Sequence, residues 1–167
     1  EIDGMGKKFA RLREHNFDSC QLVSWNPAAW TDENASLLKT LLEQYQITVS
    51  AFWCGWSGPA AWNFYDGPLT LGLVPVEYRQ MRIENLCDGA DFAHKLGITD
   101  VVTHMGFIPE NPYDPNFSSF CIAVRTVAEH LKKNGQCLLF ETGQETPVTM
   151  LRCFEAVGTD NLYVNLD

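Results

Sequence analysis

The chain has 167 residues, enough for one ordinary domain with a hydrophobic core. Hydrophobic residues make up 46% and charged residues 20%, which is typical of a globular protein and excludes a disordered one. Lys and Arg total 12 against 21 acidic residues, so the net charge is −9. A negative charge of this size does not favour binding to nucleic acid or to anionic lipid. No apolar run is long enough to span a bilayer, and we expect neither a nucleic-acid nor a membrane partner.

Six cysteines are spread along the chain without a CxxC pair. This spacing indicates that the cysteines act as small buried hydrophobic residues and do not form disulfides or a thiolate metal site. A reducing, cytoplasmic location fits that use of cysteine.

The pattern of apolar residues predicts alternating helices and strands. Helices are expected at residues 7–15, 31–45, 75–96, 117–133 and 146–157. Short stretches rich in β-branched and aromatic residues predict strands at residues 20–25, 47–53, 98–104, 136–141 and 162–167. The helix faces expected to be buried are Leu37, Leu38, Leu41, Leu42 and Tyr45; Leu86, Ala90, Ala93 and Leu96; Phe120, Val124, Val127 and Leu131; and Val148, Leu151 and Phe154.

Alternating helices and strands imply a parallel sheet with right-handed crossovers. Two architectures fit: a complete doubly wound domain, or an incomplete (β/α)8 TIM barrel, which needs about 250 residues when whole. The first predicted element is a helix without a preceding strand, and the last is a strand without a covering helix. We therefore expect residues 1–167 to form a single α/β domain that is a partial TIM barrel.

Residues 54–74 form an unusually long loop, with aromatic residues at Trp56, Trp62, Phe64 and Tyr65. A loop of this length is usually functional or disordered, and its aromatic residues argue against disorder. With Trp53 before it, the loop provides either an apolar wall for a sugar ring or a hydrophobic cluster that holds the loop in place.

Two arginines, Arg79 and Arg82, lie near the start of the helix that follows this loop. They could receive a phosphate or a carboxylate. A solvated helix face is the favoured interpretation.

Polar side chains stand at the ends of four predicted strands, where a barrel would bring them to one rim. These are His104, Glu141, Asp167 and the pair Ser24 and Trp25. Residues 138–145, LLFETGQE, show the pattern most clearly, because the apolar run ends on Glu141 before a helix opened by Thr146 and Pro147.

Glu141 and Asp167 would lie on neighbouring strands, where carboxylates can bind a divalent metal through oxygen. Two carboxylates do not complete a site, so further ligands would have to come from other strands. The alternative is that Glu141 caps the helix after it and that Asp167 is solvated. Spacing alone does not decide between the two.

Three further side chains near this rim are candidates for binding substrate. His104 ends a strand and precedes a loop with glycine and proline, so we expect it to bind a substrate oxygen or to carry a proton. Gln144 and Glu145 either hold substrate hydroxyls or simply suit the first turn of a helix.

Several motifs now resemble one family. LLFETGQE followed by a helix and VNLD, together with GITDVVTHMGFIP and the loop ending GPLTLGLVP, is similar to the sugar phosphate isomerase/epimerase group of xylose-isomerase-like barrels. The resemblance covers nearly the whole chain. It implies a (β/α)8 barrel whose first strand would precede Glu1 and whose last two strands would follow Asp167.

The resemblance also implies a divalent metal, which could be Mn, Mg, Co or Zn. In this family the metal is held by a Glu, an Asp, a His and a second Glu on successive late strands. The first Glu falls on Glu141 and the Asp on Asp167, while the other two would lie beyond residue 167. In the isomerases and epimerases of the family, the two glutamates also move the proton next to a carbonyl, which makes Glu141 a catalytic candidate.

The leading hypothesis is a metal-dependent isomerase or epimerase acting on a sugar or sugar phosphate, with His104, Trp53, Trp56, Gln144 and Glu145 around the substrate. A non-catalytic sugar-binding barrel, or a truncated relic, is the alternative. A metal-dependent endonuclease on the same barrel fits poorly, because those enzymes use several zinc ions and many histidines. This chain has four histidines and a net charge of −9.

Overall fold

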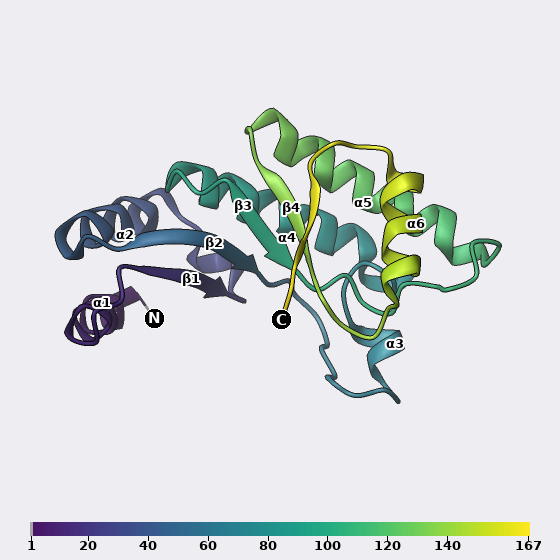
Figure 1. Ribbon diagram of the computed structural model, residues 1–167, viewed down its shortest axis with the longest axis horizontal. Coiled ribbons are helices and arrows are strands. Elements are labelled where there is room, and N and C mark those ends of the chain that lie inside the picture. Colours follow the sequence, from purple (N-terminus) through teal and green to yellow (C-terminus); the bar gives the residue numbers. More distant parts are fainter. Residues whose placement is uncertain (1) are drawn as a thin grey trace.

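The computed structural model describes residues 2–167 and contains one sheet of five parallel strands in the order β1-β2-β3-β4-β5 (Figure 1). The strands are β1 (Ser19–Ser24), β2 (Thr48–Cys54), β3 (Asp100–Thr103), β4 (Cys137–Glu141) and β5 (Leu162–Asn165). Each strand pairs in parallel with the next one along the chain. The predicted α/β fold, with parallel strands alternating with helices, is confirmed.

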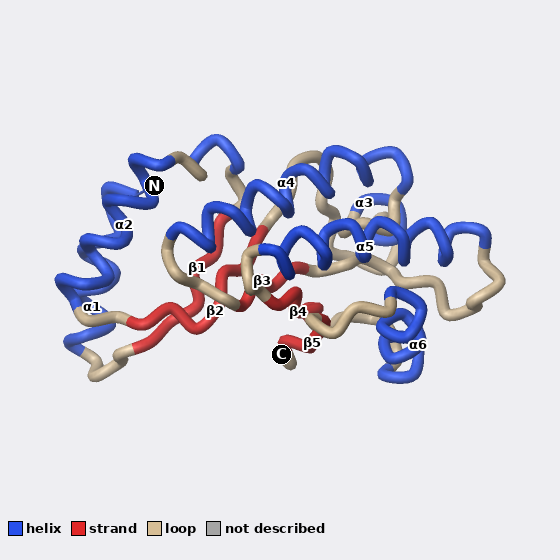
Figure 2. Tube along the Cα trace, turned by 90° about the horizontal axis from the view of Figure 1, so that it is seen from above, coloured by secondary structure: helices blue, strands red, loops and turns tan. Residues whose placement is uncertain are grey.

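The helices are α1 (Met5–Glu14), α2 (Asp32–Tyr45), α3 (Gly67–Thr70), α4 (Val76–Lys95), α5 (Pro115–Lys133) and α6 (Pro147–Val157), with 3-10 turns at Ile2–Gly4 and Pro27–Ala29. The longer helices form an arc along the outer side of the curved sheet (Figure 2). In the part of the chain that the structure describes, the opposite side of the sheet carries no helix. None of the described helices has both the length and the apolar character needed to cross a bilayer.

Side-chain caps explain where the helices begin. The hydroxyl of Thr31 accepts from the backbone N–H of Asn34 at the start of α2, and that of Thr146 accepts from Thr149 at the start of α6. Asp114 caps α5 in the same way. The predicted opening of α6 by Thr146 and a proline is therefore confirmed.

The core lies between the sheet and the helices on its outer side. The predicted inward faces of α4 and α5 are confirmed, because their stripes are fully buried at Leu86, Ala90, Ala93, Phe120, Val124, Val127 and Leu131. Leu96, the last residue predicted for the α4 face, follows the end of the helix and is partly buried against the core. The prediction for α2 is only partly right, since Leu38 is buried and Leu37 is exposed.

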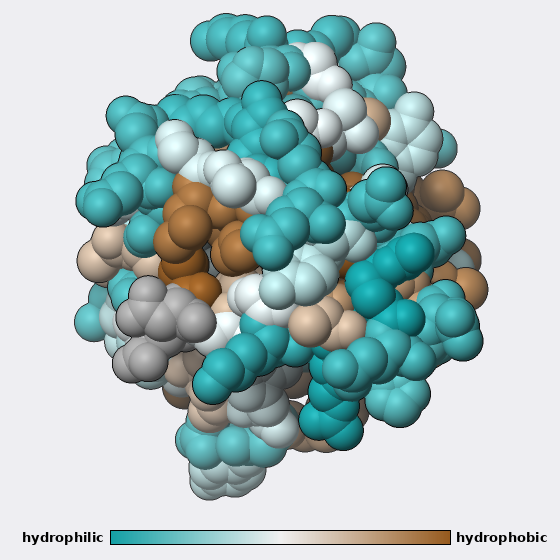
Figure 3. Space-filling model, turned by 90° about the vertical axis from the view of Figure 1, so that its left-hand side faces the viewer, coloured by the Kyte–Doolittle hydropathy of each residue, from teal (hydrophilic) through white to brown (hydrophobic). Residues whose placement is uncertain are grey.

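The predicted inward face of α6 is wrong for two of its three residues, while Phe154 packs against the core, with its ring 4.9 Å from that of Phe140. Val148 and Leu151 are 63% and 62% exposed, while Met150 and Cys153 are buried. Apolar residues occupy both sides of this helix, so periodicity does not select the inner one. Figure 3, which shows the side of the molecule that carries α1 and α2, has a limited apolar patch within a mostly hydrophilic surface.

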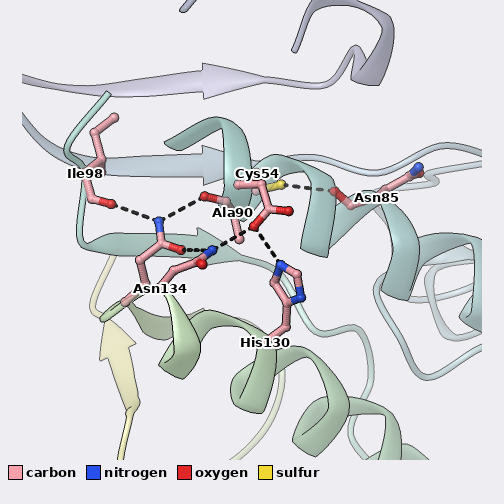
Figure 4. Close-up of polar contacts among 8 residues, drawn as sticks. Cys54, Asn85, Ala90, Ile98, His130 and Asn134 are labelled. Carbon is pink, nitrogen blue, oxygen red and sulfur yellow. Dashed lines mark hydrogen bonds and ion pairs between the residues drawn. The ribbon is translucent and has the colours of Figure 1, made fainter. Parts of the chain in front are cut away.

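A polar cluster joins α4, α5 and the start of β4 (Figure 4). The buried amide of Gln136 donates to the backbone carbonyls of Ala90 at 3.0 Å and Ile98 at 2.9 Å. At the edge of the cluster, His130 Nε2 lies 2.7 Å from Asp91 Oδ1. Because these carbonyls are buried, Gln136 supplies hydrogen bonds that water cannot.

We expect Gln136→Leu to lower the free energy of unfolding by about 1–3 kcal/mol, because two buried carbonyls lose their donor. Gln44→Leu, at an exposed position of α2, is the control and should change little. Urea unfolding followed by circular dichroism measures both. Equal midpoints for the two variants would contradict this role of Gln136.

Candidate active site at the carboxyl edge of the sheet

A cavity of about 520 Å³ opens at the carboxyl ends of the strands. Trp53 of β2, His104 after β3, Glu141 of β4 and Asp167 after β5 all line it. The rest of the lining is Trp62, Asn63, Phe64, Leu71, Phe107, Thr142, Gly143 and Gln144. Five of the seven predicted site residues therefore share one cavity: Trp53, His104, Glu141, Gln144 and Asp167.

Glu141 and Asp167 reach this cavity from neighbouring strands. Glu141 lies opposite Asn165 in the register of β4 and β5, and Asp167 is two residues further along. The pairing continues past the strand ends, because Thr142 N–H donates to Asn165 O and Asp167 N–H donates to Thr142 Oγ1. The alternative that Glu141 caps α6 is excluded, since Thr146 fills that role.

The chemistry of these two groups fits part of a divalent-metal site. Carboxylate oxygens are suitable ligands for Mg²⁺ and Mn²⁺, and for Zn²⁺ in mixed sites. Among residues 2–167, no group of three or more His, Cys, Asp and Glu side chains is placed to hold a metal ion. The pair would supply at most two ligands, so these residues alone do not complete the coordination of an ion, and the predicted metal site stays a prediction.

His104 is held as a neutral hydrogen-bond donor. Its side chain is 5% exposed, and its Nδ1 accepts from the backbone N–H of Gly106 at 3.1 Å, which leaves the proton of the neutral ring on Nε2. Burial lowers the pKa of His104, and a hydrogen bond with Gln144 partly offsets this. Gly143 allows the close approach, because a Cβ there would lie 2.5 Å from His104 Nε2.

Two predicted residues, Trp56 and Glu145, are not part of the lining. Trp56 is 2% exposed, and its ring is stacked behind Trp62 with centroids 6.5 Å apart. Direct contact of Trp56 with a sugar is therefore not supported by its burial. Burial raises the pKa of the Glu145 carboxyl, whose Oε2 lies near the backbone of Gly143.

The sequence analysis placed Trp25 at a strand end but did not connect it with the aromatic residues of the loop. Trp25, directly after β1, has ring centroids 4.9 Å from Trp53, 5.1 Å from Trp56 and 6.0 Å from Trp62. Its place at a strand end was visible, but its contacts with a loop about 30 residues later were not. The predicted aromatic cluster is confirmed, and two of its members, Trp53 and Trp62, line the cavity, while their contact with a sugar stays a prediction.

Arg82 fixes the loop that contributes to this cluster. The guanidinium is fully buried and donates to the carbonyls of Ser57 at 3.2 Å, Pro59 at 2.8 Å and Gly72 at 2.7 Å. Its Cζ also lies 4.1 Å from the centroid of the Trp56 ring. It joins the two ends of the loop, so the favoured interpretation, a solvated helix face, is wrong for Arg82. The guanidinium is occupied by loop carbonyls and is not exposed to receive the phosphate or carboxylate that was the other possibility.

Arg79, one turn earlier on α4, has a similar role. It donates to the carbonyls of Leu73 at 2.7 Å and Val74 at 2.6 Å, and to the side chains of Asn116 and Ser119. Within residues 2–167 neither arginine forms a salt bridge. Burial lowers the pKa of both, to about 10 for Arg82.

The family to which the chain belongs follows from comparison with known proteins. The family model described as xylose isomerase-like TIM barrel matches residues 9–167. The chain belongs to this family. A comparison with the sequences of curated proteins gives no match.

Solved structures agree with the assignment to the xylose isomerase-like TIM barrels. A xylose isomerase domain protein from Planctomyces limnophilus is 27% identical with a TM-score of 0.90, over 95% of this chain and 57% of that one. A xylose isomerase-like TIM barrel protein from Mycobacterium smegmatis, in complex with magnesium, is 20% identical with a TM-score of 0.73, over 99% and 56%. D-allulose 3-epimerase from Methylomonas sp., in complex with D-allulose, is 16% identical with a TM-score of 0.74, over 100% and 57%.

The chain thus has part of a TIM barrel, the fold on which sugar isomerases and epimerases of this family are built. It spans 56–57% of the length of these three relatives. The family assignment agrees with the resemblance found in the sequence motifs.

We expect Arg82→Met to loosen residues 57–72, because three loop carbonyls lose a charged donor. Chymotrypsin should then cut near the exposed residues Phe64 and Tyr65 about tenfold faster or more. Arg11→Met, at an exposed position of α1, is the matched control. Identical cleavage rates for both variants would show that Arg82 does not hold the loop.

Proposed function

We propose that the full-length protein is a metal-dependent isomerase or epimerase that moves a proton at the carbon next to the carbonyl of a sugar or sugar phosphate. The observation that carries the proposal is the shared cavity of Glu141 and Asp167 at the carboxyl edge of a barrel of this family. The Methylomonas relative of the same fold is solved with a sugar, D-allulose.

The lining of the cavity combines aromatic and polar side chains, which suits a sugar. Trp53 and Trp62 provide aromatic surface for the C–H groups of the substrate. Gln144 and His104, whose ring meets that of Trp62 edge to face at 5.1 Å, provide polar groups for the hydroxyl or carbonyl oxygens of the substrate. Phe64 and Phe107, whose rings meet edge to face at 5.9 Å, add further aromatic surface to the lining on the loop side.

Glu141 is the proposed acid/base. One carboxylate oxygen, Oε2, accepts from Asn165, which leaves the other free to face the cavity. Together with Asp167, Glu141 would also hold the divalent cation, with Mn, Mg, Co and Zn all acceptable to two carboxylates. When bound, such a cation polarises the substrate carbonyl and hydroxyl, which makes the neighbouring C–H more acidic. We place this reaction in the cytoplasm, in keeping with six free cysteines.

Metal content tests the roles of Glu141 and Asp167. We expect Glu141→Gln and Asp167→Asn in the full-length protein to lose most bound metal, because each removes a charged oxygen ligand. Glu129→Gln, the same chemical change at an exposed position of α5, should retain it. Elemental analysis after dialysis measures all three, and equal metal content in Glu141→Gln and its parent would remove Glu141 from the site.

Proton exchange tests the reaction itself. Incubation with a panel of ketoses and aldoses in D₂O should introduce deuterium next to the carbonyl, detected by NMR, and a chelator should abolish it. Glu141→Gln should slow exchange by at least about 100-fold, the lower end for a general acid/base. A sugar that binds with metal present, yet never exchanges, would instead identify a non-catalytic binding barrel.

A further inference from the structure

Glu141 is in contact with a relay of two amide side chains from other strands. Asn165 Nδ2 of β5 donates to Glu141 Oε2 at 2.5 Å. Gln21 Nε2 of β1 donates in turn to Asn165 Oδ1 at 3.0 Å. The relay therefore joins the first, fourth and fifth strands of the sheet.

The tilt of the strands brings Gln21 and Asn165 together. Gln21 pairs with Ala51, while Asn165 pairs with Glu141 at the carboxyl ends of the strands. If the pairing is followed from strand to strand, the position of β5 level with Gln21 lies four residues before Asn165. The two amides nevertheless meet across the inner face of the sheet. Such a stagger is what the shear of a barrel produces. Side chains from alternate strands fill a barrel layer in the same way.

The order of donors and acceptors fixes the direction of each group. An ionised carboxylate only accepts, so Asn165 must turn its NH₂ toward Glu141. Gln21 Nε2 donates to Asn165 Oδ1, so turning the Asn165 amide over would break this hydrogen bond as well. The hydrogen bond from Asn165 to Oε2 orients the carboxylate of Glu141 and leaves its other oxygen, Oε1, for the cavity.

The geometry points to Asn165, oriented by Gln21, as a positioning residue for the Glu141 carboxylate. This inference rests on the proposed function, in which Glu141 is a metal ligand and a proton carrier. Replacing a residue that orients a metal ligand commonly changes the affinity for the metal, although that residue does not contact the metal. Gln21 acts only through Asn165, so its effect must disappear when Asn165 is absent.

The test is the dissociation constant of Mn²⁺, measured by titration of the full-length protein. We expect Asn165→Leu and Asn165→Ser each to weaken binding by about 10–100-fold. Gln21→Met should weaken it less, by about threefold, and adding it to Asn165→Leu should have no further effect. Gln44→Met is the exposed control for Gln21→Met and should bind as the parent does. The melting temperature of each metal-free variant shows that it is folded.

The outcomes separate this inference from the proposed function. Loss of Mn²⁺ binding in Glu141→Gln, with parental affinity in both folded Asn165 variants, would overturn the positioning role and leave the metal site standing. Additive effects of the Gln21 and Asn165 substitutions would overturn the relay. Parental affinity in Glu141→Gln as well would reject the metal site itself.

Discussion

The pairing of β4 with β5 is the constraint on which the site depends. It sets Glu141 opposite Asn165 and extends beyond the strands through the backbone of Thr142. Because side chains alternate along a strand, Asn165 and Asp167 share a face, and both reach the Glu141 side of the sheet. A slip of one residue would turn both toward the helices, and the carboxylate pair would be lost.

The second constraint lies on the other side of the cavity, in residues 54–74. So long a segment leaves many backbone carbonyls without partners in a sheet or helix. Arg82 and Arg79 satisfy several of them from α4, and the stacking of Arg82 on Trp56 links the same anchor to the aromatic cluster. The aromatic side chains that we propose for sugar binding are thus held in place by two buried arginines that lie outside the lining of the cavity.

The sequence was sufficient for the order of the elements and for the carboxylate pair, because parallel strands of a barrel end at one rim. Glu141 and Asp167 could be predicted for that reason. The role of Arg82 could not, since its partners are backbone carbonyls, which leave no pattern in the side chains. The relay from Gln21 also escaped prediction, because it depends on the tilt between strands far apart in the chain. Both faces of α6 are apolar, so the sequence predicted a buried Val148, whereas the side chain is exposed.

The central claim is that Glu141 and Asp167 share one cation. The most direct measurement is an anomalous difference map from crystals of the full-length protein grown with Mn²⁺. The account predicts one strong peak at the carboxyl edge of the sheet, at coordination distance from oxygens of both side chains. A peak that one of the two carboxylates does not touch, or Mn²⁺ bound only elsewhere on the protein, would contradict it.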